Sequence, residues 1–464
     1  MTSGFASLNT ALSALRYTRV AMDVASDNIA NISTEGYARR RGDSASVAGG
    51  ATPAMWFRSA NVGDGVAVTG VSRMTDELLN VRARREHGNQ SFLDVQATAL
   101  ARVEDGIGEP GANGLSAALD RFQSAWGTLS MNPAGTSSSA ARANVLAAAA
   151  TVVDTARGQL RQVGAEAGDQ RVLALTDASE VDTLGRDLAK INSSIVSGRL
   201  NGSNVNALLD SRDQIAGRMA ELTGAVTTVQ ADGSATVRIG GAVLVEGSAA
   251  GSFTVASGVT PTGEADGQPL RFAVTSPQGG SAVVAAGGEL GGVAQLLDVT
   301  FPTYLADLAA VVRDVADRVN TQHAAGYDAQ GNAGAAVFSY DPADVLGTVE
   351  VALSDPRLLA ASAGPTGADG DNAARIGELA GLGDGYQRLV SGFGASVSSL
   401  NRQAASQQVL TTQVDLARDQ LGGVSLDEEM VNLTVLQRQY EAAARVMSTV
   451  DSLLDTLINR MGVG

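Results

Sequence analysis

The last forty or so residues carry one uninterrupted apolar seam, and that seam limits the folds open to this chain. Apolar residues recur there at alternating spacings of three and four, among them Leu433, Leu436, Tyr440, Met447, Leu454 and Leu457. This period is typical of a long amphipathic helix. Ser425 followed by Glu428 indicates a capping box at its start. An isolated helix gains little stability in water until its apolar face is covered, so this segment needs a partner surface.

The N-terminal segment carries a second, narrower seam. Leu8, Leu12, Leu15 and Met22 share one face of a helix that we expect to be about 28 residues long, on the helical period of 3.6. The two end helices can cover each other as an intramolecular coiled coil, or both can be completed by other subunits. We favour completion by other subunits, because one narrow partner helix is not enough for both ends if neighbouring copies also pack against them.

The end of the first helix is unusually specified. Asn28 and Asn31 lie three residues apart and are followed by Gly36, Tyr37 and the arginine run 39–41. Glycine suits the left-handed position that ends a helix, and asparagine tolerates the surrounding turn conformations. We interpret the arginines as solvated or helix-terminal charge.

The middle of the chain is expected to be helical apart from one insertion. Apolar seams at 146–163, 181–195 and 305–319 predict helices, as does a stretch from about 373 to 421. Between 224 and 290, β-branched residues alternate with glycine turns, which predicts strands and hairpins. The fold of 335–372 is left open. Hydrophobic residues make up 44% of the chain and aromatics only 4%, which favours helix packing.

Charge and composition exclude several classes of function. The formal net charge of −16 argues against a nucleic acid or an anionic membrane as partner. No apolar run approaches the 18 residues that indicate a membrane span, and no secretory signal is evident. The chain has no cysteine, which removes disulfides and thiolate metal sites. We therefore expect it to be cytoplasmic, or to leave the cell without a signal peptide.

No catalytic, cofactor or metal site is expected. The two histidines, His87 and His323, are far apart in the sequence, and neither HExxH nor a phosphate-binding loop is present. A calcium-like loop begins at Asp328, but Ala333 replaces the required glycine and Ser339 the required glutamate, so we interpret it as a turn. We do not expect an enzyme.

The two ends together resemble a known family. "ASDNIANISTEGYARR" and "GVSLDEEMVNLTVLQRQYEAAARVMSTVDSLLDTLINRM" resemble the terminal signatures of the bacterial flagellar axial proteins, which comprise rod, hook and hook-associated proteins. The internal stretches "NALLDSRDQI" and "NTQHAAGYDAQGNAG" resemble the hook-associated members.

The resemblance implies a mainly α, α+β fold. Its three parts are a terminal coiled-coil axial domain (1–50 with 410–464), a helical rod-like middle domain (51–223 with 291–409) and a small β-rich insertion domain (224–290). It implies a structural adaptor between hook and filament, exported through the flagellar type III apparatus and found at the hook–filament junction outside the cell.

The implied partners are further copies in a ring-like layer, the hook protein, a second junction protein, and an export chaperone at the C-terminal helix. The residues expected to assemble are those of both seams together with Asn28, Asn31, Gly36 and Tyr37. Two alternatives stay open: a hook or rod structural protein, or a surface-exposed binding module or adhesin that uses 224–290.

Overall fold

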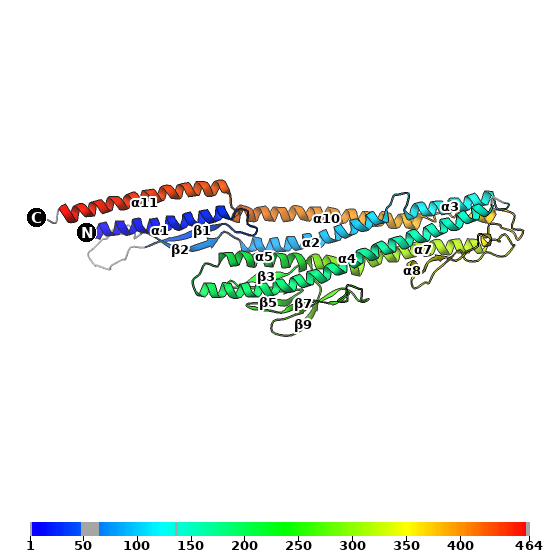
Figure 1. Ribbon diagram of the computed structural model, residues 1–464, viewed down its shortest axis with the longest axis horizontal. Coiled ribbons are helices and arrows are strands. Elements are labelled where there is room, and N and C mark those ends of the chain that lie inside the picture. The colour runs from blue at the N-terminus through cyan, green and yellow to red at the C-terminus, as the bar shows by residue number, and fades with distance from the viewer. Residues whose placement is uncertain (1, 48–64, 135–137, 461–464) are drawn as a thin grey trace.

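The protein is an elongated, mainly helical molecule with both chain ends at one extremity (Figure 1). The computed structural model describes residues 2–47, 65–134 and 138–460. Two helices form that extremity, α1 (Thr2–Ala30) and α11 (Leu426–Arg460), and they lie side by side and antiparallel. The hairpin of β1 (Arg40–Ser46) and β2 (Val66–Arg73) lies against α1. The mainly α fold expected from the sequence is confirmed.

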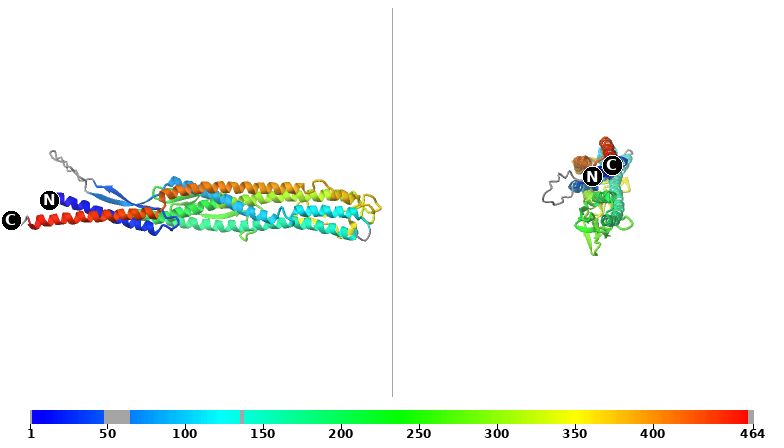
Figure 2. Two further views of the ribbon diagram at one scale, coloured as in Figure 1. Left: turned by 90° about the horizontal axis from the view of Figure 1, so that it is seen from above. Right: turned by 90° about the vertical axis from the view of Figure 1, so that its left-hand side faces the viewer.

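A long rod of helices forms the rest of the molecule (Figures 1 and 2). Its helices are α2 (Glu77–Ile107), α3 (Leu115–Met131), α4 (Ser138–Leu200), α5 (Asn206–Thr223), α6 (Gly288–Gln295), the π-helix η1 (Leu296–Thr300), α7 (Phe301–Ala324) and α10 (Asp384–Gly422).

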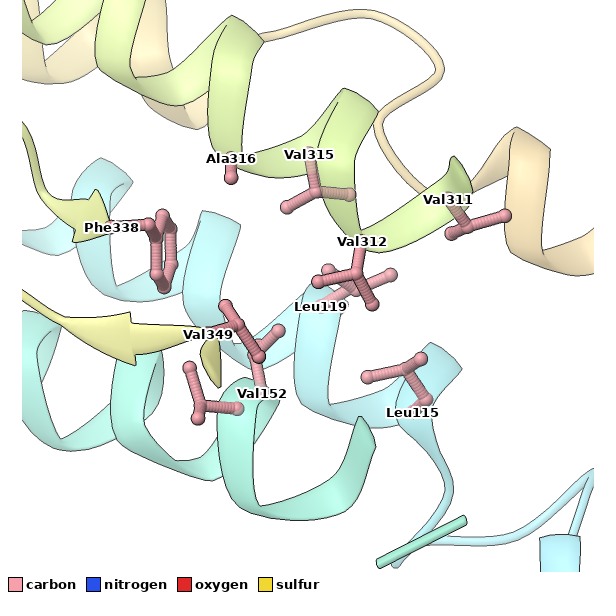
Figure 3. A pocket seen from close by; sticks show the side chains of 10 residues that line it. Leu115, Leu119, Val152, Val311, Val312, Val315, Ala316, Phe338 and Val349 are labelled. Atoms are coloured by element: carbon pink, nitrogen blue, oxygen red, sulfur yellow. The ribbon is translucent and has the colours of Figure 1, made fainter. Parts of the chain in front are cut away.

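The core of the rod's far half is built from aliphatic side chains and a few large rings. Phe122 and Trp126 of α3 are fully buried and meet edge to face, with ring centroids 6.2 Å apart. Beside them, Leu119, Val152 and Val312 face a small apolar cavity of about 10 Å³ (Figure 3). A cavity of this size without polar partners is too small and too apolar to hold an ordered water.

The β-rich insertion consists of two small antiparallel sheets. One contains β3 (Val226–Val229), β4 (Ala235–Ile239), β5 (Ala242–Glu246) and β6 (Ala249–Ala250), and the other β7 (Ser252–Ser257), β8 (Arg271–Thr275) and β9 (Ser281–Val284). Phe253 and Phe272 stack within its core at 5.3 Å. Asn192 of α4 exchanges two 2.8 Å hydrogen bonds with the backbone of Ala235, which fixes the sheet to the rod.

The tip far from the chain ends contains the segment whose fold the sequence left open. It comprises β10 (Phe338–Ser339), α8 (Val345–Thr348), β11 (Glu350–Val351), the short 3-10 turn η2 (Pro356–Leu358) and α9 (Asp371–Gly377). The strands β10 and β11 pair antiparallel.

Two helix predictions need correction. The seams at 146–163 and 181–195 belong to one 63-residue helix, α4. The seam is interrupted because buried polar residues, Glu166, Gln170 and Asp177, lie where α4 passes from one hydrophobic core to the next. Conversely, the predicted helix over 373–421 is split into α9 and α10, because Gly381 takes a left-handed φ of 67° that a continuous helix does not allow.

Candidate functional site

The contact between α1 and α11 is built on small residues. Ala11, Thr18, Ala21 and Ala25 form the buried face of α1. Because alanine and threonine are small, the two helix axes can approach closely. Leu436 of α11 is buried against Ala21 and Ala25 at 6% exposure. Tyr17, Met22 and Leu433 are the partly buried neighbours of this small core.

The predicted residues of the first seam lie at the edge of this contact. Leu8, Leu12, Leu15 and Met22 are each half-buried rather than buried. The sequence prediction followed the large aliphatic residues and therefore missed the alanine face. Ala11, Thr18 and Ala25 are each seven residues apart, and this heptad spacing could have indicated it.

The predicted residues of the second seam mostly face α1. Leu433, Met447 and Leu454 are half-buried and Leu436 is buried, whereas Tyr440 is exposed. Leu457 lies in α11, but its side chain is outside the described part of the chain. Ser425 precedes the helix, and its Oγ accepts a hydrogen bond from the Glu428 amide at 3.5 Å, as the capping prediction requires.

Asn28 closes the turn that follows α1. Its Nδ2 donates to the Arg40 carbonyl at 2.9 Å, and its Oδ1 accepts from the Arg40 amide at 3.0 Å and from the Tyr37 hydroxyl at 2.9 Å. The Asn28 side chain is buried. It bonds both the amide and the carbonyl of Arg40, as the backbone of a neighbouring strand would. Asn28 and Tyr37 of the sequence motif are therefore brought together, and they hold the start of β1 against the end of α1.

The other two residues of that motif have local roles. Asn31 donates to the Asp27 carbonyl at 2.9 Å and accepts from Thr34 at 3.2 Å, both within the same turn. Gly36 has a φ of 75°, and a Cβ at that position would overlap the Gln214 side chain. Gly36 is thus required both by its backbone conformation and by the close approach of α5.

The arginine run is not simply solvated. Arg39 pairs with the buried Glu429 at 2.7 Å and with Glu428 at 3.0 Å, which ties the start of the hairpin to the first turn of α11. Arg40 pairs with Asp210 of α5 at 3.3 Å. Only Arg41, which pairs with Asp43, is largely exposed. The interpretation as solvated charge is therefore wrong for Arg39 and Arg40, because their partners come from distant segments.

A second arginine completes the joint between the hairpin and the rod. Arg73 at the end of β2 pairs with Asp210 and Asp213 of α5, both at 2.7 Å. Burial raises the pKa of Asp210, and Arg73 and Arg40 oppose that rise. The two aspartates belong to the "NALLDSRDQI" stretch, so that stretch supplies the carboxylates that hold the hairpin.

A polar cleft of about 550 Å³ opens beside these ion pairs, between the segment 35–38, α2, α5 and α10. Three charged or polar side chains of its lining have acidic partners. Arg84 pairs with Glu77, and His87 and Arg418 both contact Asp415. These three pairs lie within α2 and α10 of the rod, and the cleft lies where the segment 35–38 meets the rod.

Comparison with known families identifies the chain. The family model for the helical domain of the flagellar hook-associated protein FlgK matches residues 100–338, which is more than half of the chain. The chain belongs to the FlgK family. It is therefore a hook-associated structural component of the bacterial flagellum, and the resemblance to the flagellar axial proteins is confirmed.

FlgK relatives match over nearly the full length. Flagellar hook-associated protein 1 of Bacillus subtilis is 26% identical over 520 residues, covering 100% of both chains. The Escherichia coli protein of the same name is 24% identical and covers 97% of this chain and 99% of its own length. The solved flagellar hook junction protein FlgK from Burkholderia pseudomallei has the same fold, with a TM-score of 0.63 at 16% identity, covering 74% of this chain and 100% of that one.

Models shared with rod proteins match the two ends. The flagella basal body rod model matches residues 8–37, which contain most of α1 and its closing turn. The C-terminal model of the basal body rod proteins matches 422–461, which contains α11. The FlgK-specific match thus lies in the rod and insertion, and the matches shared with rod proteins lie in the terminal helical pair.

The histidines lie in separate structural settings in this FlgK-family chain. His87 contacts Asp415 at 3.1 Å beside the polar cleft. His323 is fully buried, with Nδ1 at 2.6 Å from the Ala335 carbonyl and Nε2 accepting from the Ala360 amide at 2.7 Å. The Asp328 loop is a turn in which the carboxylate accepts from the Gln330 and Asn332 amides.

The described residues contain neither a grouped set of metal ligands nor a membrane-spanning helix. No group of three or more His, Cys, Asp or Glu side chains among them is placed to hold a metal ion. Within the same residues, no helix is both long and apolar enough to cross a membrane.

Proposed function

We propose that this chain is the adaptor that joins the flagellar hook to the filament. In this role it assembles with further copies into a ring-like layer, with the hook protein on one side and a second junction protein on the other. Support comes from its relatives, which are named as hook-associated and hook junction proteins. The helical rod supports this role over that of a hook subunit, which the sequence resemblance implies would be β-rich between its terminal helices.

The proposed route to that position is the flagellar type III export apparatus. The chain is cytoplasmic before export and lies outside the cell, at the hook–filament junction, afterwards. An export chaperone covers α11 in the cytoplasm. The apolar side chains that α11 leaves exposed, Met430 and Val431 among them, support the need for such a cover.

Assembly is proposed to proceed by coupled folding of the terminal helices. The buried apolar side chains of the α1–α11 core are Ala21, Ala25 and Leu436, compared with the large buried cores of the rod and insertion. A fully buried leucine contributes only about 1.5–3 kcal/mol, so this contact alone stabilises the pair weakly. Neighbouring subunits then supply the rest of the stabilisation.

The chain is proposed to consist of three domains. They are the terminal axial domain (1–50 with 410–464), the rod-like middle domain (51–223 with 291–409) and the β-rich insertion (224–290). The ion pair of Arg40 with Asp210 of α5 connects the first to the second. Helix α10 runs from the second domain into the first, and a helix break between Gly423 and Ser425 separates it from α11.

A single pair of variants tests the adaptor role. Leu436→Asp places a charge in the α1–α11 contact, and we expect it to abolish motility and filament attachment while the rod stays folded. Gln437→Asp places the same charge on the adjacent exposed position and should leave filaments unchanged. Electron microscopy of cells and circular dichroism of the purified chains measure both. Normal filaments on Leu436→Asp cells would contradict the proposed role.

A further inference from the structure

The rod contains two hydrophobic cores, and buried polar side chains lie where they meet. Along α4, the buried core of the far half ends at Ala167, and the core beside the insertion begins at Ala174. Glu166, Gln170 and Asp177 lie at or beside this boundary, each at 4% exposure. These three residues are called the polar band below. Helix α4 passes through the polar band without a break (Figure 1).

The hydrogen bonds of the polar band are incomplete. Glu166 accepts from Arg102 of α2 at 3.4 Å and from Gln170 at 2.9 Å. Among the described residues, Gln170 Oε1 and Asp177 Oδ2 are buried without a hydrogen-bond partner. A buried acceptor without a donor is unfavourable, so a movement that admits water to these atoms recovers free energy. A cleft of about 320 Å³, lined by residues of α2, α4 and α6, already opens beside the band.

Helix α4 is locally weak at the polar band. Gly164 and Gly168 lie on either side of Glu166 in its sequence. A Cβ at either glycine would meet no other described atom within 4 Å, and neither glycine has a positive φ. Packing and backbone conformation therefore do not require glycine at these positions. Apart from proline, glycine is the least favourable residue inside a helix, so two of them lower the local stability of α4.

A second helical segment is irregular at the same level of the rod. It consists of α6, the π-helix η1 and α7 in succession. Val293 of α6 belongs to the core beside the insertion, and Leu296 of η1 belongs to the core of the far half. The π-helix thus lies at the boundary between the cores. A π turn disturbs the regular helical hydrogen bonds and is a common place for a helix to bend.

We propose that the polar band is a bending joint, at which the far half of the rod tilts relative to the half that carries the insertion. Both hydrophobic cores stay intact, because Gly164, Gly168 and the π-helix η1 take up the deformation. Water reaches the unpaired acceptors in the bent form. The joint belongs to the single chain, so it can be tested independently of the adaptor role. Within the proposed layer, it lets the far half of the rod move while the terminal pair stays in place.

Hydrogen exchange of the purified full chain tests the joint. After correction for intrinsic rates, we expect the amides of 164–172 to exchange at least tenfold faster than those of 149–156 and 185–192. All three segments belong to α4, and the two flanking segments pack against the two cores. They therefore serve as internal references. Equal protection of the three segments would overturn the proposal.

Alanine substitution tests the role of the two glycines. Gly164→Ala with Gly168→Ala strengthens the helix without a steric conflict, and it should slow exchange of 164–172 at least fivefold. The matched control is Gly127→Ala with Gly392→Ala, which replaces two equally open helical glycines in α3 and α10. This pair should slow exchange of 164–172 less than twofold. Similar slowing by both pairs would show a general gain in stability and contradict the joint.

Distances between spin labels measure the bend itself. The chain has no cysteine, so Thr151→Cys and Thr183→Cys can be labelled selectively. Both positions are exposed on α4, on opposite sides of the polar band. A straight helix would place them about 48 Å apart at 1.5 Å per residue. Electron paramagnetic resonance should give a broad distribution that extends to shorter distances and narrows with Gly164→Ala and Gly168→Ala. A single narrow distance without these substitutions would overturn the proposal.

Discussion

Arg73 at the end of β2 and Asp210 in α5 form a buried ion pair, with Nε and Oδ1 2.7 Å apart. Asp213 binds the adjacent nitrogen of the same guanidinium, at 2.7 Å from Nη2. A planar guanidinium held by two carboxylates has a fixed orientation, so the hairpin is held at one angle to the rod. The direction of the terminal helical pair depends on this contact.

The first prediction concerns that joint. Arg73→Met should lower the free energy of local opening of the β1–β2 hairpin by about 1–3 kcal/mol, because it removes the one cation that Asp210 and Asp213 share. Arg40 still pairs with Asp210, and Arg212 still pairs with Asp213. Hydrogen exchange of the hairpin amides measures the effect.

Arg41→Met is the matched control, since Arg41 is exposed and its ion pair among the described residues is with Asp43. It should change the free energy of opening by less than about 0.5 kcal/mol. Similar effects at both positions would contradict the joint.

The second prediction distinguishes the two asparagines of the N-terminal motif. Asn28→Asp should destabilise the start of β1 by about 1–3 kcal/mol, because the Arg40 carbonyl loses its buried donor. Asn31→Asp should have a much smaller effect, since Asn31 bonds only within its own turn, near solvent. Thermal unfolding and hydrogen exchange of Arg40 report both. An equal loss in the two variants would show that Asn28 has no special role.

The third prediction uses the dry cavity in the rod (Figure 3). Val312→Ile adds one methylene beside a cavity that is too small to hold it fully, so it should change the free energy of unfolding of the rod by less than about 1 kcal/mol. Val312→Ala enlarges the cavity and should cost about 1–3 kcal/mol. Denaturant unfolding of the full chain measures both values. A loss of more than about 1 kcal/mol with isoleucine would mean that the surrounding side chains leave no usable space.

The fourth prediction is a loss of stability in acid caused by His323. Burial lowers the pKa of His323 to about 4, because Nε2 must stay unprotonated to accept from Ala360. The unfolded chain therefore binds this proton at higher pH than the folded chain does. Stability is complete above a pH of about 6.5 and falls as pH decreases toward 4, by up to about 3 kcal/mol. His323→Gln should remove this part of the slope, which unfolding at a series of pH values measures.

The fifth prediction has the opposite sign and concerns Asp177 of α4. Burial, reinforced by Glu289, raises the pKa of Asp177 to about 7, and within the described residues its Oδ2 has no hydrogen-bond partner. The folded chain thus holds this proton longer than the unfolded chain, so stability falls as pH rises from about 4 to 7. Asp177→Asn should raise stability at pH 8 by about 2 kcal/mol and have little effect at pH 4. A stabilisation of equal size at both pH values would contradict this origin.

Local patterns in the sequence were sufficient for much of the architecture. Both terminal helices, the Ser425 cap, the helix around 305–319 and the strands of 224–290 are confirmed, because each depends on residues within one or two turns or one hairpin. The two errors in helix extent have identifiable causes. Buried polar residues interrupt the seam of α4 without ending the helix, and one left-handed glycine separates α9 from α10.

The sequence by itself determined that this chain has long amphipathic helices at both ends, because helical periodicity is a property of neighbouring residues. Only the tertiary structure decided which face of α11 is covered, that alanines rather than leucines form the centre of the α1 contact, and that Arg40 and Arg73 meet carboxylates of α5. Those contacts join residues far apart in the chain. Their geometry follows from how whole helices pack against one another, and no local pattern encodes it.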